Sequence, residues 1–231
     1  MLEAINLTKR YGGHEALSDL NLSVAQGEIF CLLGQNGAGK TTTINLFLGL
    51  IGATSGKALI NGVEVKPNSN ATSKMIAYIP EVVQLYGNLS GLENLDFFSR
   101  IAGFRYSKEE LIGYLMKAGL QETAHGNKLA SYSKGMRQKV GISIALSKNA
   151  DFIFMDEPIS GLDPKATVEF TAICKELSQM GKSIFMATHD IFNAVNVSTK
   201  IGIMKEGSLV YTSETNAINA NELQDLYLKT I

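Results

Sequence analysis

The segment Gly34–Thr41, with the sequence GQNGAGKT, constrains this chain more than any other part of it. An apolar run, Ile29–Leu33, precedes it, and Thr42–Leu50 continues with the apolar spacing of a helix. Glycine permits positive φ angles and close backbone approach, so consecutive N–H groups can converge on an anion at a helix N-terminus. The order of strand, glycine loop and helix therefore predicts a parallel α/β fold that binds phosphate groups, with a nucleotide as the first-choice ligand.

The residue types within this loop predict separate roles. Lys40 is expected to reach the β- and γ-phosphates, and the Thr41 hydroxyl is expected to ligate Mg²⁺. The remaining residues would contact the phosphates mainly through their backbone. The expected nucleotide-binding residues of this segment are Gly34, Gln35, Asn36, Gly37, Ala38, Gly39, Lys40, Thr41 and Thr42.

A second chemical signal stands at Phe152–Pro158, where an apolar strand ends in Asp156 and Glu157. Parallel sheets present ligand-binding groups at the carboxyl ends of their strands. Asp156 is expected to hold Mg²⁺ through water, and Glu157 is the candidate general base that orients the attacking water. The alternative is a solvated acidic turn after a core strand.

Composition excludes several classes of protein. The 231 residues include 21 basic and 22 acidic side chains, and the net charge of -1 gives no general attraction to nucleic acid or anionic lipid. No nucleic-acid partner is therefore expected. Cys31 and Cys174 are expected to be buried free thiols, as in a cytoplasmic protein. No apolar stretch approaches the ~20 residues that span a bilayer, and no secretory signal opens the chain, so we expect it neither to cross a membrane nor to be secreted by itself.

Hydrophobic periodicity predicts an N-terminal β-rich part, a helical insertion and a C-terminal α/β part. Residues 85–147 follow helical spacing, and a helix at 166–179 alternates with strands, which is typical of a parallel sheet. Asn61-Gly62 predicts a hairpin turn, and Glu206-Gly207 predicts a terminal hairpin. The expected strands are 4–7, 20–24, 28–33, 57–60, 63–66, 152–155, 183–187 and 200–204.

Length and hydrophobic content favour a single domain. Within 1–231, we expect residues 1–80 and 150–231 to form the catalytic core with its β subdomain. Residues 81–149 would form the helical insertion.

The segment Tyr132–Gln138 adds a third signal, since Ser133 is a suitable N-cap for a helix running to about Ser147. The N–H groups at that helix end would then face outward, where they can bind phosphate. Together with the phosphate loop, the Asp-Glu-Pro strand end and the later His189, the chain resembles the ATP-binding subunit of an ABC transporter. The resemblance covers essentially the whole sequence.

The resemblance implies a shared active site. In that family two subunits pack head to tail around ATP, so Ser133 and Gly135 would contact the γ-phosphate bound to the partner. Tyr11 would stack on adenine, although a surface tyrosine at a strand end is the simpler alternative. His189 would contact the γ-phosphate and help to hold the transition state. The loop 160–163 would cross the dimer interface, and it can serve equally as a turn and helix cap.

Two sites depart from the family pattern. Glu81 stands where most members have the glutamine that senses Mg²⁺ and water, so it would bind the metal directly or swing out until the site closes. Lys134 and Met136 replace a glycine and a glutamine of the signature. Lys134 would either contact phosphate or point to solvent. These variants resemble the type-2 exporter branch, which includes drug, antibiotic-immunity and polysaccharide exporters and a copper-processing subunit.

The resulting hypothesis is a P-loop α/β ATPase with a RecA-like parallel sheet, an N-terminal antiparallel β subdomain and a helical insertion. It would hydrolyse ATP with Mg²⁺ as the motor subunit of an exporter, in a homodimer or a paired assembly. It would lie on the inner face of the membrane, bound to separate transmembrane permease subunits. The alternatives are an ABC ATPase of DNA repair or translation and a regulatory module without turnover.

Contact with the permease would fall where Leu85, Tyr86, Leu89 and Phe97 cluster. For Leu85 and Tyr86, burial in the core is an equally good interpretation, and for Leu89 and Phe97 it is the better one.

Overall fold

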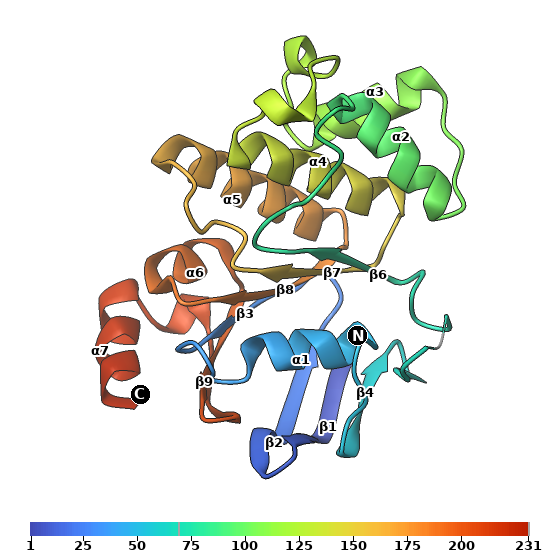
Figure 1. The fold of residues 1–231 in the computed structure, drawn as a ribbon. Coiled ribbons are helices and arrows are strands. Elements are labelled where there is room, and N and C mark those ends of the chain that lie inside the picture. Colours follow the sequence, from blue (N-terminus) through green and yellow to red (C-terminus); the bar gives the residue numbers. More distant parts are fainter. Residues whose placement is uncertain (69, 231) are drawn as a thin grey trace.

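The central element of the fold is a six-stranded sheet, seen in a computed structural model that describes residues 1–68 and 70–230 (Figure 1). The strand order is β10-β9-β3-β8-β7-β6, and all neighbours are parallel except the edge strand β10. The predicted parallel α/β core is confirmed. The strands are β3 (Ile29–Leu33), β6 (Ile76–Ile79), β7 (Phe152–Asp156), β8 (Ser183–Thr188), β9 (Lys200–Lys205) and β10 (Ser208–Glu214).

A smaller antiparallel sheet packs beneath it, with the order β2-β1-β4-β5. Its strands are β1 (Leu2–Tyr11), β2 (His14–Val24), β4 (Ser55–Ile60) and β5 (Val63–Glu64). The predicted hairpin at Asn61-Gly62 is confirmed, and both residues have the positive φ angles, 50° and 78°, that a tight turn requires. The predicted strand 63–66 was too long. It stops at Glu64, shortly before Pro67, which has no N–H to donate to a ladder.

Helix α1 (Lys40–Phe47) lies between the two sheets (Figure 1). Phe30 and Leu32 of β3 belong to the core on the α1 side, and the residues that alternate with them belong to the core on the other face. On the α1 side the rings of Phe47 and Phe154 stack at 5.7 Å. Fully burying one such side chain stabilises a fold by about 1.5–3 kcal/mol. Because both faces are covered, the strands are continuously apolar rather than alternating.

The face of the six-stranded sheet opposite α1 is covered by three helices, α5 (Pro164–Gln179), α6 (Ile191–Val197) and α7 (Ala220–Thr230). Both cysteines are free and fully buried there, as expected, and burial raises the pKa of the Cys31 thiol to about 12.

The hairpin at Glu206-Gly207 is confirmed, but it is not terminal, since α7 follows it. Helix α6 and the short edge strand β6 were not predicted from the sequence.

The predicted helical region contains α2 (Gly91–Ile101), α3 (Lys108–Lys117) and α4 (Lys134–Ser147), with two short 3₁₀ turns at 122–124 and 129–131. Serine and glutamate form capping boxes at the starts of α2 and α3, which satisfy their free N–H groups. The three helices share an apolar cluster of their own. Within the described residues, none of the helices combines the length and apolarity needed to cross a bilayer.

Candidate nucleotide-binding site

The glycine loop connects β3 to α1, as the sequence predicts, and its glycines act in two ways. Gly37 and Gly39 have φ angles of 85° and 106°, which strain any residue with a Cβ. Gly34 does not need a positive φ; a Cβ there would lie 2.6 Å from the Met204 carbonyl oxygen of β9. The expectation of positive φ is thus met at two glycines, and close packing against β9 explains the third.

Lys40 folds back over this loop. Its Nζ donates to the carbonyl oxygens of Gly34 at 2.7 Å and Gln35 at 3.2 Å, and it lies 3.9 Å from Glu157 Oε1. Burial lowers the pKa of this ammonium, and the charges of Glu157 and Asp156 oppose that shift. The cation is therefore held at the centre of the loop, where phosphate oxygens would replace carbonyls as its acceptors.

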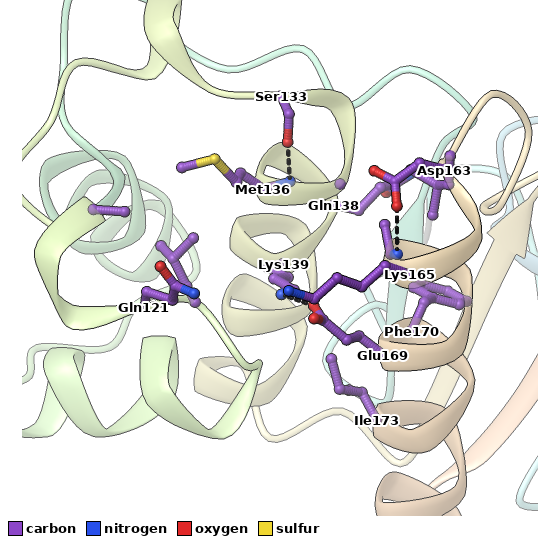
Figure 2. A pocket seen from close by; sticks show the side chains of 15 residues that line it. Gln121, Ser133, Met136, Gln138, Lys139, Asp163, Lys165, Glu169, Phe170 and Ile173 are labelled. Carbon is purple, nitrogen blue, oxygen red and sulfur yellow. Dashed lines mark hydrogen bonds and ion pairs between the residues drawn. The ribbon is translucent and has the colours of Figure 1, made fainter.

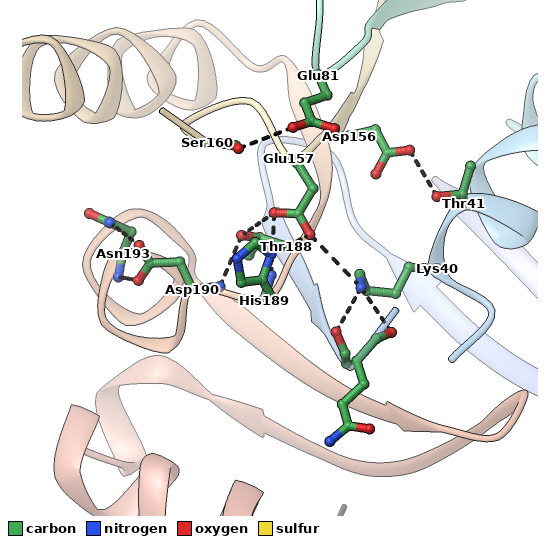
Figure 3. Close-up of polar contacts among 12 residues, drawn as sticks. Lys40, Thr41, Glu81, Asp156, Glu157, Ser160, Thr188, His189, Asp190 and Asn193 are labelled. Atoms are coloured by element: carbon green, nitrogen blue, oxygen red, sulfur yellow. Dashed lines mark hydrogen bonds and ion pairs between the residues drawn. The ribbon is translucent and has the colours of Figure 1, made fainter. Parts of the chain in front are cut away.

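Thr41 and Asp156 meet across the end of the sheet. The Thr41 hydroxyl donates to Asp156 Oδ2 at 2.9 Å (Figure 3). Burial raises the pKa of Asp156 and the neighbouring Glu157 charge raises it further, while the Thr41 hydrogen bond opposes both. A hydroxyl beside a single carboxylate is a hard oxygen pair of the kind that binds Mg²⁺ together with substrate phosphates, so this donor set fits that metal.

Glu157 sits on a strained turn directly after β7. Its φ angle is 43°, which is uncommon outside glycine, and its N–H donates to the Ala187 carbonyl oxygen of the adjacent β8 at 2.9 Å. Its side chain accepts from Thr188 Oγ1 at 3.1 Å and lies 2.9 Å from His189 Nδ1 (Figure 3). The structure thus brings Glu157 and His189 together from neighbouring strand ends.

Lys40, Thr41, Asp156 and Glu157 line an open cleft of about 390 Å³, whereas His189 contacts Glu157 without lining that cleft. Tyr11 lies at its rim, 47% exposed, with the Lys9 ammonium 4.9 Å from its ring centroid. His14, to which the sequence analysis gave no role, also lines the cleft because the β1–β2 turn places it near Tyr11. The lining residues are Tyr11, His14, Ala16, Gln35, Asn36, Gly37, Gly39, Lys40, Thr41, Thr42, Glu81, Asp156 and Glu157.

Ser133 and Gly135 lie outside the cleft that contains Tyr11 and Lys40. Ser133 caps α4 by accepting from the Met136 N–H at 3.3 Å, and both residues line a separate pocket of about 220 Å³ between α4 and α5 (Figure 2). Neither lines the cleft that contains Lys40. The expected site residues therefore fall into two groups that one chain does not bring together.

The sequence profile described as "ABC transporter" matches residues 17–160. The chain belongs to the ABC transporter family.

Two relatives and one solved structure illustrate the match. The cassette is 33% identical over 227 residues to the probable multidrug ABC transporter ATP-binding protein YbhF of Escherichia coli, covering 97% of this chain and 39% of that one. It is 34% identical to the bacitracin transport ATP-binding protein BcrA of Enterococcus faecalis, covering 96% and 70%. The dimeric post-hydrolysis cassette MJ0796, bound to ADP and Pi, superposes with a TM-score of 0.82 at 26% identity, covering 93% and 99%.

These matches confirm the predicted family and the P-loop cassette fold. The cassette spans well under half the length of YbhF and about two thirds of BcrA.

The departures of this cassette from the family pattern occupy defined places. Glu81 Oε1 accepts from Ser160 Oγ at 3.1 Å, and Lys134 Nζ donates to the Ser160 carbonyl oxygen. Lys134 therefore neither extends into solvent nor reaches a phosphate in this chain. Met136 packs against the apolar cluster of the helical region.

Three residues that contact the site had no individual role predicted for them, although Gln138 and Ser160 lie in the segments 132–138 and 160–163 that were singled out. Thr188 and Ser160 donate to Glu157 and Glu81, and Gln138 donates to the Pro158 carbonyl oxygen at 3.0 Å. For Thr188, its place at the end of a buried strand, directly before His189, is the one signal that would have indicated it. Ser160 and Gln138 become visible only once α4 is packed against the loop after β7.

Proposed function

We propose that this cassette hydrolyses ATP to ADP and phosphate and that its glycine loop, Tyr11 and the carboxyl ends of β7 and β8 form the binding site. The convergence of Lys40, the Thr41–Asp156 pair and Glu157 on one cleft, with His189 in contact with Glu157, supports this proposal. ATP would lie with its phosphates over the glycine loop and its adenine against Tyr11. The exposed ring of Tyr11 is available for stacking.

Thr41 and Asp156 would hold Mg²⁺, which supplies charge neutralisation at the β- and γ-phosphates. Lys40 would exchange its two carbonyl acceptors for phosphate oxygens. This exchange keeps a buried cation fully hydrogen-bonded, so the apo contacts preorganise it for the nucleotide.

Glu157 would orient the attacking water and accept its proton. The water oxygen forms the new bond to the γ-phosphorus, the bond to the β–γ bridging oxygen breaks, and ADP leaves with that electron pair. Thr188 and the strained turn limit where the Glu157 carboxylate can lie. His189, 62% exposed at its side chain, is free to turn from Glu157 toward the γ-phosphate.

A second cassette would complete the site. Ser133 and Gly135 lie outside the cleft of their own chain, on an exposed or half-buried helix start. In a head-to-tail pair, each α4 N-terminus would face the γ-phosphate held by the partner, where a helix dipole and free N–H groups favour negative charge. The dimeric MJ0796 cassette supports this arrangement.

The names of the relatives support coupling to export. YbhF is described as a multidrug protein and BcrA as a bacitracin transport protein. We therefore assign this chain to the cytoplasmic face of the membrane, bound to separate permease subunits. The exposed aromatic cluster of Tyr86 and Phe97, 50% and 38% exposed with ring centroids 5.0 Å apart, is the proposed docking surface.

Substitution of Glu157 by glutamine tests the proposal. Glu157→Gln is expected to bind ATP, to stop releasing phosphate and to accumulate as an ATP-dependent dimer in size-exclusion chromatography, because the composite site closes without turnover. Tyr211→Phe, a change outside the cleft, is the control. Persistent phosphate release would overturn the role of Glu157, and a strictly monomeric protein would overturn the shared site.

A further inference from the structure

Three loops meet at Ser160. Its hydroxyl donates to Glu81, in the loop after β6, and its carbonyl oxygen accepts from Lys134, the first residue of α4. Ser160 itself follows β7 and Glu157. A continuous polar bridge therefore joins the start of α4 to a carboxylate at the nucleotide cleft, with Lys134 and Glu81 at its two ends.

Glu81 is close to the candidate metal site, but its carboxylate accepts a hydrogen bond from Ser160, which is not part of that site. It lines the same cleft as Thr41 and Asp156, and its negative charge, after burial and the Glu157 charge, helps to raise the pKa of Asp156. Its hydrogen bond nevertheless goes to Ser160, whereas the Thr41 hydroxyl is bonded to Asp156 (Figure 3). Glu81 and Asp156 thus accept hydrogen bonds from different hydroxyl groups.

This separation has a chemical reason. Mg²⁺ in nucleotide sites usually keeps several waters and is bound by one or two carboxylates together with phosphate oxygens. A released Glu81 would bring another anionic oxygen to a site that already contains Asp156 and adjoins Glu157. The metal would then be held more tightly and would keep fewer waters, at the expense of turnover.

We propose that Lys134 and Ser160 are positioning residues that hold the Glu81 carboxylate out of the metal coordination sphere in the open cassette. The inference rests on the proposed function, because it requires a nucleotide-bound metal at Thr41 and Asp156.

The bridge can be broken without separating the elements that it joins. Gln138, one turn along α4 from Lys134 and 1% exposed, donates to the carbonyl oxygens of Pro158 at 3.0 Å and Glu81 at 3.5 Å. These contacts hold α4 against both loops independently of Lys134. Loss of the Lys134 or Ser160 side-chain contact should therefore free the Glu81 carboxylate while the fold persists.

Mn²⁺ binding to the full chain loaded with ADP, measured by electron paramagnetic resonance, tests the proposal. Ser160→Ala removes the hydroxyl and Lys134→Met removes the ammonium. Each is expected to tighten Mn²⁺ binding by about fivefold, because a further carboxylate becomes available to the metal. Saturating phosphate release and KM for ATP should both fall about threefold, because stabilising the ground-state metal complex alone lowers both to a similar extent.

Two controls separate positioning from a general effect of lost charge. Lys134→Arg retains a cationic donor and is expected to keep wild-type Mn²⁺ affinity. Lys175→Met makes the same chemical change on an exposed lysine of α5 and is expected to leave both Mn²⁺ affinity and phosphate release unchanged.

The decisive comparison is made in a Glu81→Gln background, where Ser160→Ala and Lys134→Met should no longer alter Mn²⁺ affinity. Equal shifts with and without Glu81, or no shift in either background, would overturn the inference. A wild-type chain that binds no ADP–Mn²⁺ would instead overturn the proposed function, so the two failures are distinguishable.

Discussion

The nucleotide cleft and the start of α4 differ in how many of their polar groups find partners within one chain. In the cleft, the central charged and hydroxyl groups have partners from the same chain, such as Lys40 on Gly34 and Thr41 on Asp156. At α4, Ser133 is satisfied only as a helix cap, and no group of the cleft faces it. Under the proposed function, nucleotide binding would be a property of one chain, whereas closure of the site would require two.

The largest effect is expected from Lys40→Met, which removes the cation of the cleft. Phosphate release should fall by about a thousandfold, because a buried charge aimed at the developing charge of the γ-phosphate is lost. A phosphate-release assay measures this, and calorimetry should show weakened ATP binding. Lys66→Met, on the exposed β subdomain, is the matched control. Near-normal turnover in Lys40→Met would show that the cleft is not the reaction site.

Ser133→Asp tests the second of these regions, the start of α4. Aspartate is as good an N-cap as serine, so α4 should remain intact, but its charge would repel a phosphate presented by a partner. ATP binding to the single chain should stay within about twofold, while ATP-driven pairing and phosphate release should fall by about a hundredfold. Analytical ultracentrifugation measures the pairing, and Ser133→Asn, a neutral cap, should lose less. Equal losses in both variants would argue against a phosphate facing Ser133.

A smaller effect is expected from Glu81→Gln. Phosphate release should persist but with a changed Mg²⁺ dependence, because the carboxylate beside Asp156 becomes a neutral amide. Titration of activity with Mg²⁺ and Mn²⁺ measures the change, with Glu109→Gln, an exposed position on α3, as the control. Total loss of nucleotide binding would contradict this expectation.

The smallest effect concerns stability. The pKa of Asp156 is raised in the folded chain by burial and by the charge of Glu157, so the stability it contributes is present below its unfolded pKa and is lost as pH rises through the folded value. At pH 7 the charged form therefore costs stability. Nucleotide-free Asp156→Asn should melt about 2 °C higher at pH 7, and the gain should shrink as pH falls toward about 4.

Calorimetry at several pH values measures that gain, and Asp225→Asn, an exposed position on α7, should show none of it. A lower melting temperature for Asp156→Asn would mean that its hydrogen bond with Thr41 outweighs the cost of charge burial.

Local sequence signals predicted much of the fold and of the candidate site. The apolar run before the glycine loop, the Ser133 cap and the Asn61-Gly62 turn were readable because each depends on residues within one or two turns of chain. The edge strand β6 was missed because four residues, Ile76–Ile79, carry too little periodicity. The functional role of each cleft residue remains a prediction, to be decided by the substitutions above.

The sequence by itself determined where phosphate could bind, since glycine spacing and the residues that follow it dictate the loop. It also placed Asp156 and Glu157 at a strand end, where a parallel sheet exposes them. Only the tertiary structure decided which groups meet: His189 with Glu157, and Lys134 with Glu81 through Ser160. Those contacts join residues far apart in the chain, and their geometry depends on how helices pack on the sheet, which no local pattern encodes.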